Sequence, residues 1–212
     1  MFTHFLSFDW SVFAWIETHL RSGAADAFFK TVTHFGDGGL FWLALGLVLL
    51  LFHKTRRVGV VVLAAMALDV IATNVVLKHV FARPRPFALQ DVGWWVQTYV
   101  YPGLIEKPDG FSFPSGHAAG SFAGASAIFF ASKPKWVGKK GRWIALLPVV
   151  LAALVAFSRV YLEVHYASDV IAGTLVGILC GCAALLLFQC AEPLYTRINA
   201  PVVRFTEKLR RQ

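Results

Sequence analysis

The sequence predicts an all-α protein, a polytopic transmembrane helix bundle of five or six spans with interfacial helices at its N-terminus. Two properties of the whole chain lead to this prediction. Hydrophobic residues make up 57% of the 212 residues and charged residues only 15%, whereas soluble domains carry about 25% charged residues. The mean hydropathy of +0.61 leaves too few polar side chains to cover a surface in water. The length fits a single domain.

Five apolar segments are predicted to cross the bilayer, because a spanning helix needs about 20 mostly apolar residues. The first is the shortest and is expected to extend backward through Gly36–Gly39. The five segments are Leu40–Phe52, Val58–Phe81, Ser115–Ala131, Trp143–Tyr161 and Asp169–Gln189. They define a transmembrane core over residues 37–190, followed by a basic cytoplasmic tail over residues 191–212.

Residues 1–36 differ from the five apolar segments because charges interrupt their hydrophobic pattern. Glu17, Arg21, Asp26 and Lys30 recur among aromatic and aliphatic residues. Such a pattern favours one or two helices that lie in the plane of the membrane surface. A sixth span within Trp10–Phe35 is the alternative.

Lysine and arginine are concentrated at one end of the predicted spans. Most of the 20 basic residues lie after the first span, after the third span and in the tail, and the positive-inside rule places these segments in the cytoplasm. The net charge of +8 therefore reflects membrane orientation and does not predict nucleic-acid binding. The outer face holds the long loop Pro86–Pro114, whose aromatic residues suit the headgroup level. These residues are Trp94, Trp95, Tyr99 and Tyr101.

The first of three polar clusters on the outer face follows the second span. Lys78 lies near the end of this span, and Arg85 stands between Pro84 and Pro86, which stop the helix. Simple positive flanking would belong on the cytoplasmic side, so two outward cations favour an anion-binding site.

The second cluster opens the third span with Pro114-Ser115-Gly116-His117. A helix N-terminus offers free N–H groups and a positive dipole end to a phosphate. Gly116 allows a close approach of the backbone, and Ser115 adds a hydroxyl donor. Ser115 alone also fits an ordinary helix cap.

The third cluster joins the fourth and fifth spans through Arg159, His165 and Asp169. His165 and Asp169 are four residues apart, so one helical turn would bring them together. An aspartate bonded to one ring nitrogen fixes the tautomer and leaves the other nitrogen free to attack. A His–Asp pair alone also fits a helix-start hydrogen bond.

The three clusters together predict phosphoryl chemistry, because charges near a bilayer are costly without an anionic ligand. Lys78, Arg85, Arg159 and the Ser115–Gly116 amides would neutralise a phosphoryl group. One histidine would attack phosphorus, and the other would protonate the leaving oxygen and later activate water. The sequence shows no acidic cluster for magnesium and no His/Cys set for zinc, so we expect no metal and no cofactor.

The pattern Lys-x6-Arg-Pro, Pro-Ser-Gly-His and Ser-Arg-x5-His-x3-Asp, from Lys78 to Asp169, resembles the type 2 phosphatidic acid phosphatase superfamily. The resemblance implies His165 as nucleophile, Asp169 as its orienting partner and His117 as general acid. It also implies a phosphate site, made of Lys78, Arg85, Ser115, Gly116 and Arg159. Arg83 also precedes a proline, but Arg85 has the family spacing. Ala167 stands where many relatives have proline.

Within that family the chain is similar to short bacterial membrane phosphatases of the cytoplasmic membrane, with the site facing the periplasm or cell exterior. The expected partners are the bilayer and a lipid phosphate or diphosphate, with undecaprenyl diphosphate as the best candidate. Phosphatidylglycerophosphate, phosphatidate and lipid A phosphate are alternatives. A lipid phosphotransferase with the same intermediate and a non-catalytic lipid or anion transporter are rival functions. The oligomeric state is not predicted.

Three further polar residues lie near the predicted site. Asn74 is one turn before Lys78 and is expected on the same helix face. Asp69 is nine residues before Lys78, which in an α-helix is the opposite face, so we expect it to hydrogen-bond another helix. Glu163 is expected either to pair with Arg159 or to face the headgroups.

Overall fold

The structure is a computed structural model that describes residues 3–89, 101–132 and 143–210. Within these residues all regular structure is helical. The elements are α1 (Thr3–His19), α2 (Gly23–Thr33), η1 (His34–Gly39), α3 (Leu40–Leu51), α4 (Arg56–Asp69), η2 (Val70–Leu77), α5 (Lys78–Phe81), η3 (Pro86–Leu89), α6 (Gly116–Ala131), α8 (Leu146–Tyr161) and α9 (Ala167–Arg210). The predicted transmembrane helix bundle is confirmed.

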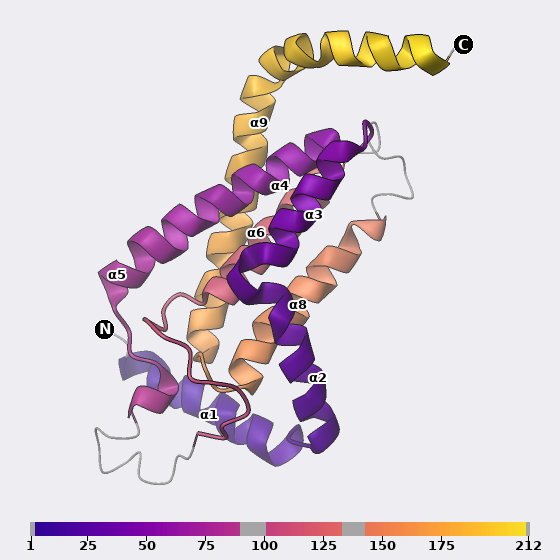
Figure 1. The fold of residues 1–212 in the computed structure, drawn as a ribbon. Helices are drawn as coiled ribbons and strands as arrows, with labels where there is room; N and C mark the ends of the chain where they lie inside the picture. The colour runs from indigo at the N-terminus through magenta and orange to yellow at the C-terminus, as the bar shows by residue number, and fades with distance from the viewer. Residues whose placement is uncertain (1–2, 90–100, 133–142, 211–212) are drawn as a thin grey trace.

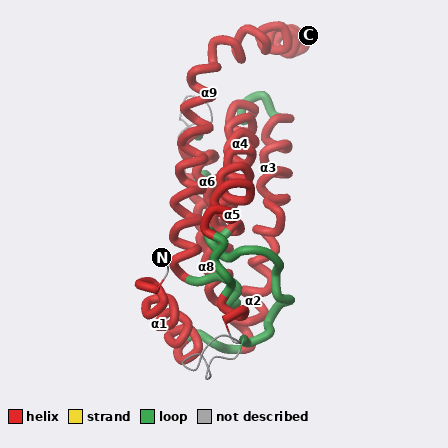
Figure 2. The backbone as a smooth tube through the Cα atoms, turned by 90° about the vertical axis from the view of Figure 1, so that its left-hand side faces the viewer, coloured by secondary structure: helices red, strands yellow, loops and turns green. Residues whose placement is uncertain are grey.

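Helix α6 is the central element of the bundle, and most of its side chains are buried. It packs against α4, α8 and α9, while α3 packs on α4 (Figure 1). Helix α1 lies across one end of the bundle, close to the start of α9 and the end of α8 (Figure 2). This end is the one that carries the three sequence clusters, because α6 begins there and α8 ends there.

Small residues allow α6 and α9 to approach closely. Gly173, Gly177 and Gly181 recur every fourth residue along the face of α9 that contacts α6. A methyl group at Gly177 would lie 2.2 Å from the carbonyl oxygen of Ala119 and 2.9 Å from the amide nitrogen of Ala123. Backbone atoms of this kind cannot move aside, so the spacing of the two helices depends on glycine, as in other membrane helix pairs.

The interfacial position of residues 1–36 stays a prediction, and the structure adds one observation to it. Helices α2 and α3 belong to one apolar stretch, Gly23–Leu51, long and apolar enough to cross a membrane, as are Arg56–Ala88 and Ala167–Thr196. The charge of Asp26 on α2 indicated an interfacial helix. In the structure Asp26 accepts a hydrogen bond from the hydroxyl of Tyr161 on α8, at 2.6 Å. A tertiary partner therefore satisfies this carboxylate against the bundle, and only α1 lies across the end.

Two further expectations concern the rest of the chain. Helix α9 continues beyond the predicted end at Gln189 to Arg210 and bends near its last third (Figure 1). Trp94, Trp95 and Tyr99 of the outer loop, and the basic segment 133–142, lie outside the described residues. The domain boundaries and the cytoplasmic position of the tail therefore stay predictions.

Replacing Gly177 by alanine should destabilise the bundle, because the added methyl overlaps the α6 backbone. Overpacking of this kind costs typically about 1–3 kcal/mol. Thermal unfolding in detergent, followed by circular dichroism, would show a lower midpoint. Gly23→Ala is the matched control, since nothing lies within 4 Å of its added methyl. Equal midpoints for both variants would contradict the close packing.

Candidate active site

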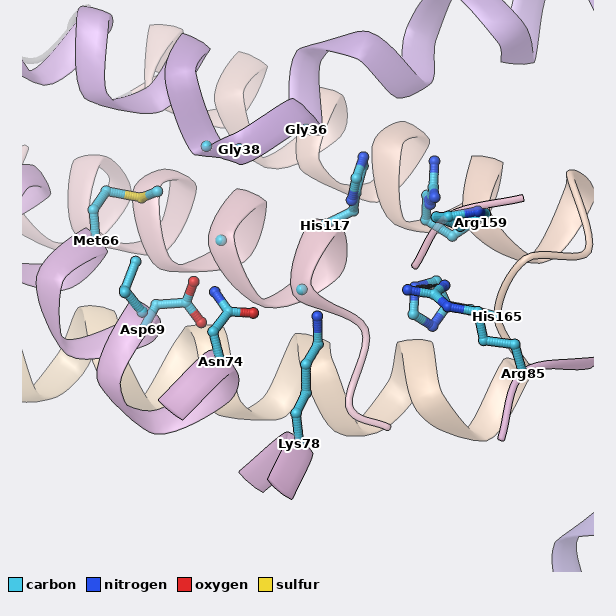
Figure 3. A pocket seen from close by; sticks show the side chains of 15 residues that line it. Gly36, Gly38, Met66, Asp69, Asn74, Lys78, Arg85, His117, Arg159 and His165 are labelled. Atoms are coloured by element: carbon cyan, nitrogen blue, oxygen red, sulfur yellow. Dashed lines mark hydrogen bonds between the residues drawn. The ribbon is translucent and has the colours of Figure 1, made fainter. Parts of the chain in front are cut away.

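A cavity of about 250 Å³ lies where η1, the end of the α4–α5 stretch, the start of α6 and the end of α8 meet (Figure 3). Six of the predicted site residues line it: Lys78, Arg85, Gly116, His117, Arg159 and His165. The three sequence clusters, far apart along the chain, therefore meet at one cavity. Asp69, Asn74, Met66 and the glycines of η1 complete its wall.

Three cations face this cavity without a carboxylate at salt-bridge distance among the described residues. Backbone carbonyls hold the guanidinium of Arg85, with Nη1 donating to Val164 at 2.9 Å and Nη2 to Asp109 at 2.9 Å. Arg159 donates from Nη1 to the hydroxyl of Thr33 at 2.6 Å, and its buried Nε has no hydrogen-bond partner in the described chain. Neutral partners fix these groups but leave their charge uncompensated, which suits an anion.

The hydrogen bonds of His165 define its tautomer. Nη1 of Arg85 lies 3.1 Å from Nε2 of His165. Because a guanidinium can only donate, Nε2 must accept and the proton must reside on Nδ1. The lone pair of Nε2 thus points toward the cations, in the position that a nucleophile requires.

Asp169 lies behind His165, away from the cavity. Its Oδ2 is 3.6 Å from Nδ1 of His165, beyond a normal hydrogen bond. Ser112 lies beside both groups: its hydroxyl donates to Oδ2 of Asp169 and is 3.4 Å from Nδ1. The predicted His–Asp pair is therefore close in space, with Ser112 as an additional neighbour that the sequence did not indicate.

Arg83 anchors Asp169 to the N-terminal helix. Its Nη1 lies 2.5 Å from Oδ1 of Asp169 and its Nη2 2.7 Å from Oδ2 of Asp9, and all three residues are buried. The guanidinium also lies over the ring of Tyr166, with its carbon 3.9 Å from the centroid. Buried charges require such pairing. The two arginines of Arg-Pro-Arg-Pro thus have different partners. Arg85 faces the cavity, and Arg83 forms a salt bridge with Asp169 behind His165.

The start of α6 supplies Gly116 and His117 to the cavity, but not Ser115. The hydroxyl of Ser115 accepts from the amide of Ala118 at 3.5 Å, as a helix cap, and its own amide donates to the carbonyl of Asp169 at 3.1 Å. Gly116 lies close to Lys78, because an added Cβ would be 3.5 Å from Nζ. Ser115 does not line the cavity, but its hydroxyl only accepts in the cap and keeps an O–H donor, so its place in the phosphate site stays a prediction.

Asp69 lines the same cavity as Lys78, which contradicts the prediction that the two lie on opposite faces. The reason is η2, a π-helical stretch over Val70–Leu77 between them. A π-helix has more residues per turn than an α-helix, so less rotation accumulates between positions 69 and 78. The hydrogen bond of Asp69 is to Thr73 of the same helix, at 2.8 Å, rather than to another helix. Asn74 also lines the cavity, as expected (Figure 3).

Glu163 does not pair with Arg159. It is buried, and its Oε1 accepts from Nη2 of Arg21, at 2.7 Å. Arg21 follows α1, and its Nη1 also donates to the carbonyl of Tyr161 at 3.2 Å. This contact ties the N-terminal helices to the turn that carries His165. Arg159 therefore has no carboxylate at salt-bridge distance within residues 3–89, 101–132 and 143–210.

Burial and surrounding charge both act on His165, which lies in the turn between α8 and α9. Loss of solvent lowers its pKa well below the ordinary value of 6.5, and the nearby cations of Arg85 and Arg159 lower it further. The imidazole is therefore neutral at pH 7, and its Nε2 lone pair accepts from Arg85 in this structure. A bound anion would offset the effect of the cations.

A helical membrane bundle with a cation-lined cavity and a neutral buried histidine defines a class of phosphate-handling membrane proteins. Comparison with known families agrees: residues 58–192 match the PAP2 superfamily. The chain belongs to this superfamily, and with it to the phosphatases, which are hydrolases. The matched region contains all the predicted site residues and ends within α9.

Three relatives illustrate the similarity. The chain is 37% identical to an undecaprenyl-diphosphatase of Sulfolobus acidocaldarius, over 64% of this chain and 58% of that protein. It is 32% identical to the decaprenylphosphoryl-5-phosphoribose phosphatase of Mycobacterium tuberculosis, over 70% of this chain and 72% of the relative. Its fold matches that of a transmembrane PAP2-type phosphatidylglycerolphosphate phosphatase from Bacillus subtilis with a TM-score of 0.68 and 24% identity, covering 88% and 87% of the two chains.

The lowered pKa of His165 predicts a loss of stability in acid. Above pH 6.5 the residue is neutral in the folded and the unfolded chain, and it contributes no pH dependence. As the pH falls below 6.5, the unfolded chain binds a proton that the folded chain does not, so the free energy of unfolding decreases. Unfolding midpoints between pH 7.5 and 5 should fall less steeply for His165→Asn than for the wild type. Parallel curves would contradict the burial of a neutral imidazole.

Proposed function

We propose that the protein is a lipid phosphatase that hydrolyses a lipid phosphate or diphosphate through a phosphohistidine at His165. The observation that supports this most directly is the contact between Arg85 and Nε2 of His165, 3.1 Å apart, on the wall of a cavity with two further uncompensated cations. A phosphoryl group placed there would meet donors on its oxygens and a lone pair in line with phosphorus. Such preorganised charge is the main source of catalysis in phosphoryl transfer.

The reaction would proceed in two steps. In the first, Nε2 of His165 bonds to phosphorus, the bond from phosphorus to the leaving oxygen breaks, and His117 protonates that oxygen. In the second, neutral His117 accepts a proton from water while the water oxygen bonds to phosphorus and the phosphorus–nitrogen bond breaks. Lys78, Arg85 and Arg159 would compensate the phosphoryl charge in both steps.

Undecaprenyl diphosphate is our preferred substrate. Its support is the 37% identity to an archaeal undecaprenyl-diphosphatase and the distribution of basic residues, which favours an outward-facing cavity. The apolar side chains of Ile71 and Val75 on η2 are more than half exposed, and they offer a lipid-facing surface next to the cavity. A phosphate-release panel that also includes phosphatidylglycerophosphate, phosphatidate and lipid A would test this preference, and faster release from any of these would replace it.

Replacing His165 by alanine should abolish phosphate release, because no other group can take the place of the Nε2 nucleophile. We expect a loss of about 10³-fold or more, measured as free orthophosphate from a lipid diphosphate in detergent. His53→Ala is the control, since His53 is exposed and does not line the cavity. Unchanged activity in His165→Ala, or phosphate recovered on a lipid acceptor instead of in solution, would contradict the proposal.

Metal removal should leave activity unchanged. Within the described ranges, no three carboxylate, imidazole or thiol groups converge in a way that could hold a metal ion, and the cavity wall carries cations where a magnesium site would carry carboxylates. Phosphate release should therefore be equal before and after dialysis against EDTA. A loss that added divalent ions restore would refute a mechanism carried by side chains alone.

A further inference from the structure

The general acid His117 has a carboxylate partner that the three sequence motifs do not contain. Oδ1 of Asp37 lies 2.9 Å from Nε2 of His117. Its other oxygen, Oδ2, lies 2.7 Å from Nδ1 of His34, an exposed residue of the same η1 segment. The carboxylate is thus held between two imidazoles, one at the surface and one on the cavity wall.

The backbone around Asp37 is shaped to make this contact. Gly38 and Gly39 adopt left-handed φ angles of 57° and 70°, which glycine tolerates without a steric penalty. Gly36 lies against the ring of His117, where an added Cβ would be 2.6 Å from Cδ2. Three glycines therefore bring an acidic residue from the middle of the apolar segment Gly23–Leu51 onto the imidazole at the start of α6.

We propose that Asp37 is the positioning residue of the general acid His117, the counterpart of Asp169 behind His165. By accepting a hydrogen bond from Nε2–H, it would hold the ring in one orientation and leave Nδ1 as the nitrogen that exchanges protons with the substrate. The negative charge would also stabilise the imidazolium that must form before Nδ1 gives its proton to the leaving oxygen. In the second step, Nδ1 would accept the proton of the attacking water, while Nε2 keeps its own proton in the hydrogen bond to Asp37.

The electrostatics of the cavity make such a carboxylate necessary. Lys78 and Arg159 face the same space as His117, and like charges oppose its protonation. His165 needs this field to stay neutral as a nucleophile, whereas His117 must carry a proton in the first step. Asp37 bonds to His117 at 2.9 Å, whereas the nearest carboxylate oxygen of Asp169 is 3.6 Å from His165, so the protonated form is stabilised more directly at His117.

The proposal rests on the proposed function and can be tested by comparing leaving groups. An alcohol is a poor leaving group that needs a proton in the transition state, whereas p-nitrophenolate leaves without one. Positioned proton transfer contributes typically about 10²–10⁴-fold. We therefore expect Asp37→Asn to lower kcat with dioctanoyl phosphatidate about 10-fold to 100-fold, since the acid remains but loses its orientation and charge. With p-nitrophenyl phosphate the change should stay within about 3-fold.

Two variants complete the experiment. Asp37→Glu keeps the charge and should recover part of the loss with phosphatidate. Glu17→Gln removes an exposed carboxylate of α1 that pairs with Arg21 and does not line the cavity, and it should leave activity on both substrates unchanged. An equal loss with both substrates, or no loss with phosphatidate, would overturn the inference alone. A wild-type protein that releases phosphate neither from these two substrates nor from undecaprenyl diphosphate would overturn the proposed function and this inference with it.

Discussion

The structure depends on an electrostatic constraint at one end of the bundle. Lys78, Arg85 and Arg159 share a small cavity inside an otherwise apolar protein, and within the described chain no carboxylate forms a salt bridge with any of the three. Neutral carbonyl and hydroxyl groups hold the two guanidinium groups in place. Three neighbouring buried cations lower the free energy of unfolding until an anion binds between them. The cluster therefore reduces stability and favours anion binding.

Two carboxylates near the site form salt bridges outside the cavity. Asp169 is bonded to Arg83 behind His165, and Glu163 to Arg21. Both arginines link the catalytic turn to the first residues of the chain, Arg83 through Asp9 and Arg21 through its position after α1. The N-terminal helix α1 is thereby linked by ion pairs to the segment that carries His165, and it packs across this end of the bundle (Figure 2).

A register change in one helix sets the depth of the cavity. The π-helical stretch η2 brings Asp69 and Asn74 to the same wall as Lys78. Intramembrane carboxylates are rare and almost always face a bundle interior or a cavity, as Asp69 does. π-Helical segments often occur at functional sites because they redirect side chains without ending the helix. Here the π-helical stretch η2 adds the polar side chains of Asp69 and Asn74 to the cavity wall, next to the cations that would hold the phosphoryl group.

The sequence by itself determined the helical membrane bundle, because apolar segments of this length satisfy their backbone in a bilayer by forming helices. It also identified five residues that line the cavity, because they stand at span ends of one membrane depth: Lys78, Arg85, His117, Arg159 and His165. The tertiary structure alone decided the partners. The motifs do not show that Arg83 pairs with Asp169 or that Ser115 caps α6. Asp37 lies outside the motifs and reaches His117 only through the fold of η1. Partners of this kind depend on contacts between distant segments and on local turns such as η2, which hydrophobic periodicity does not record.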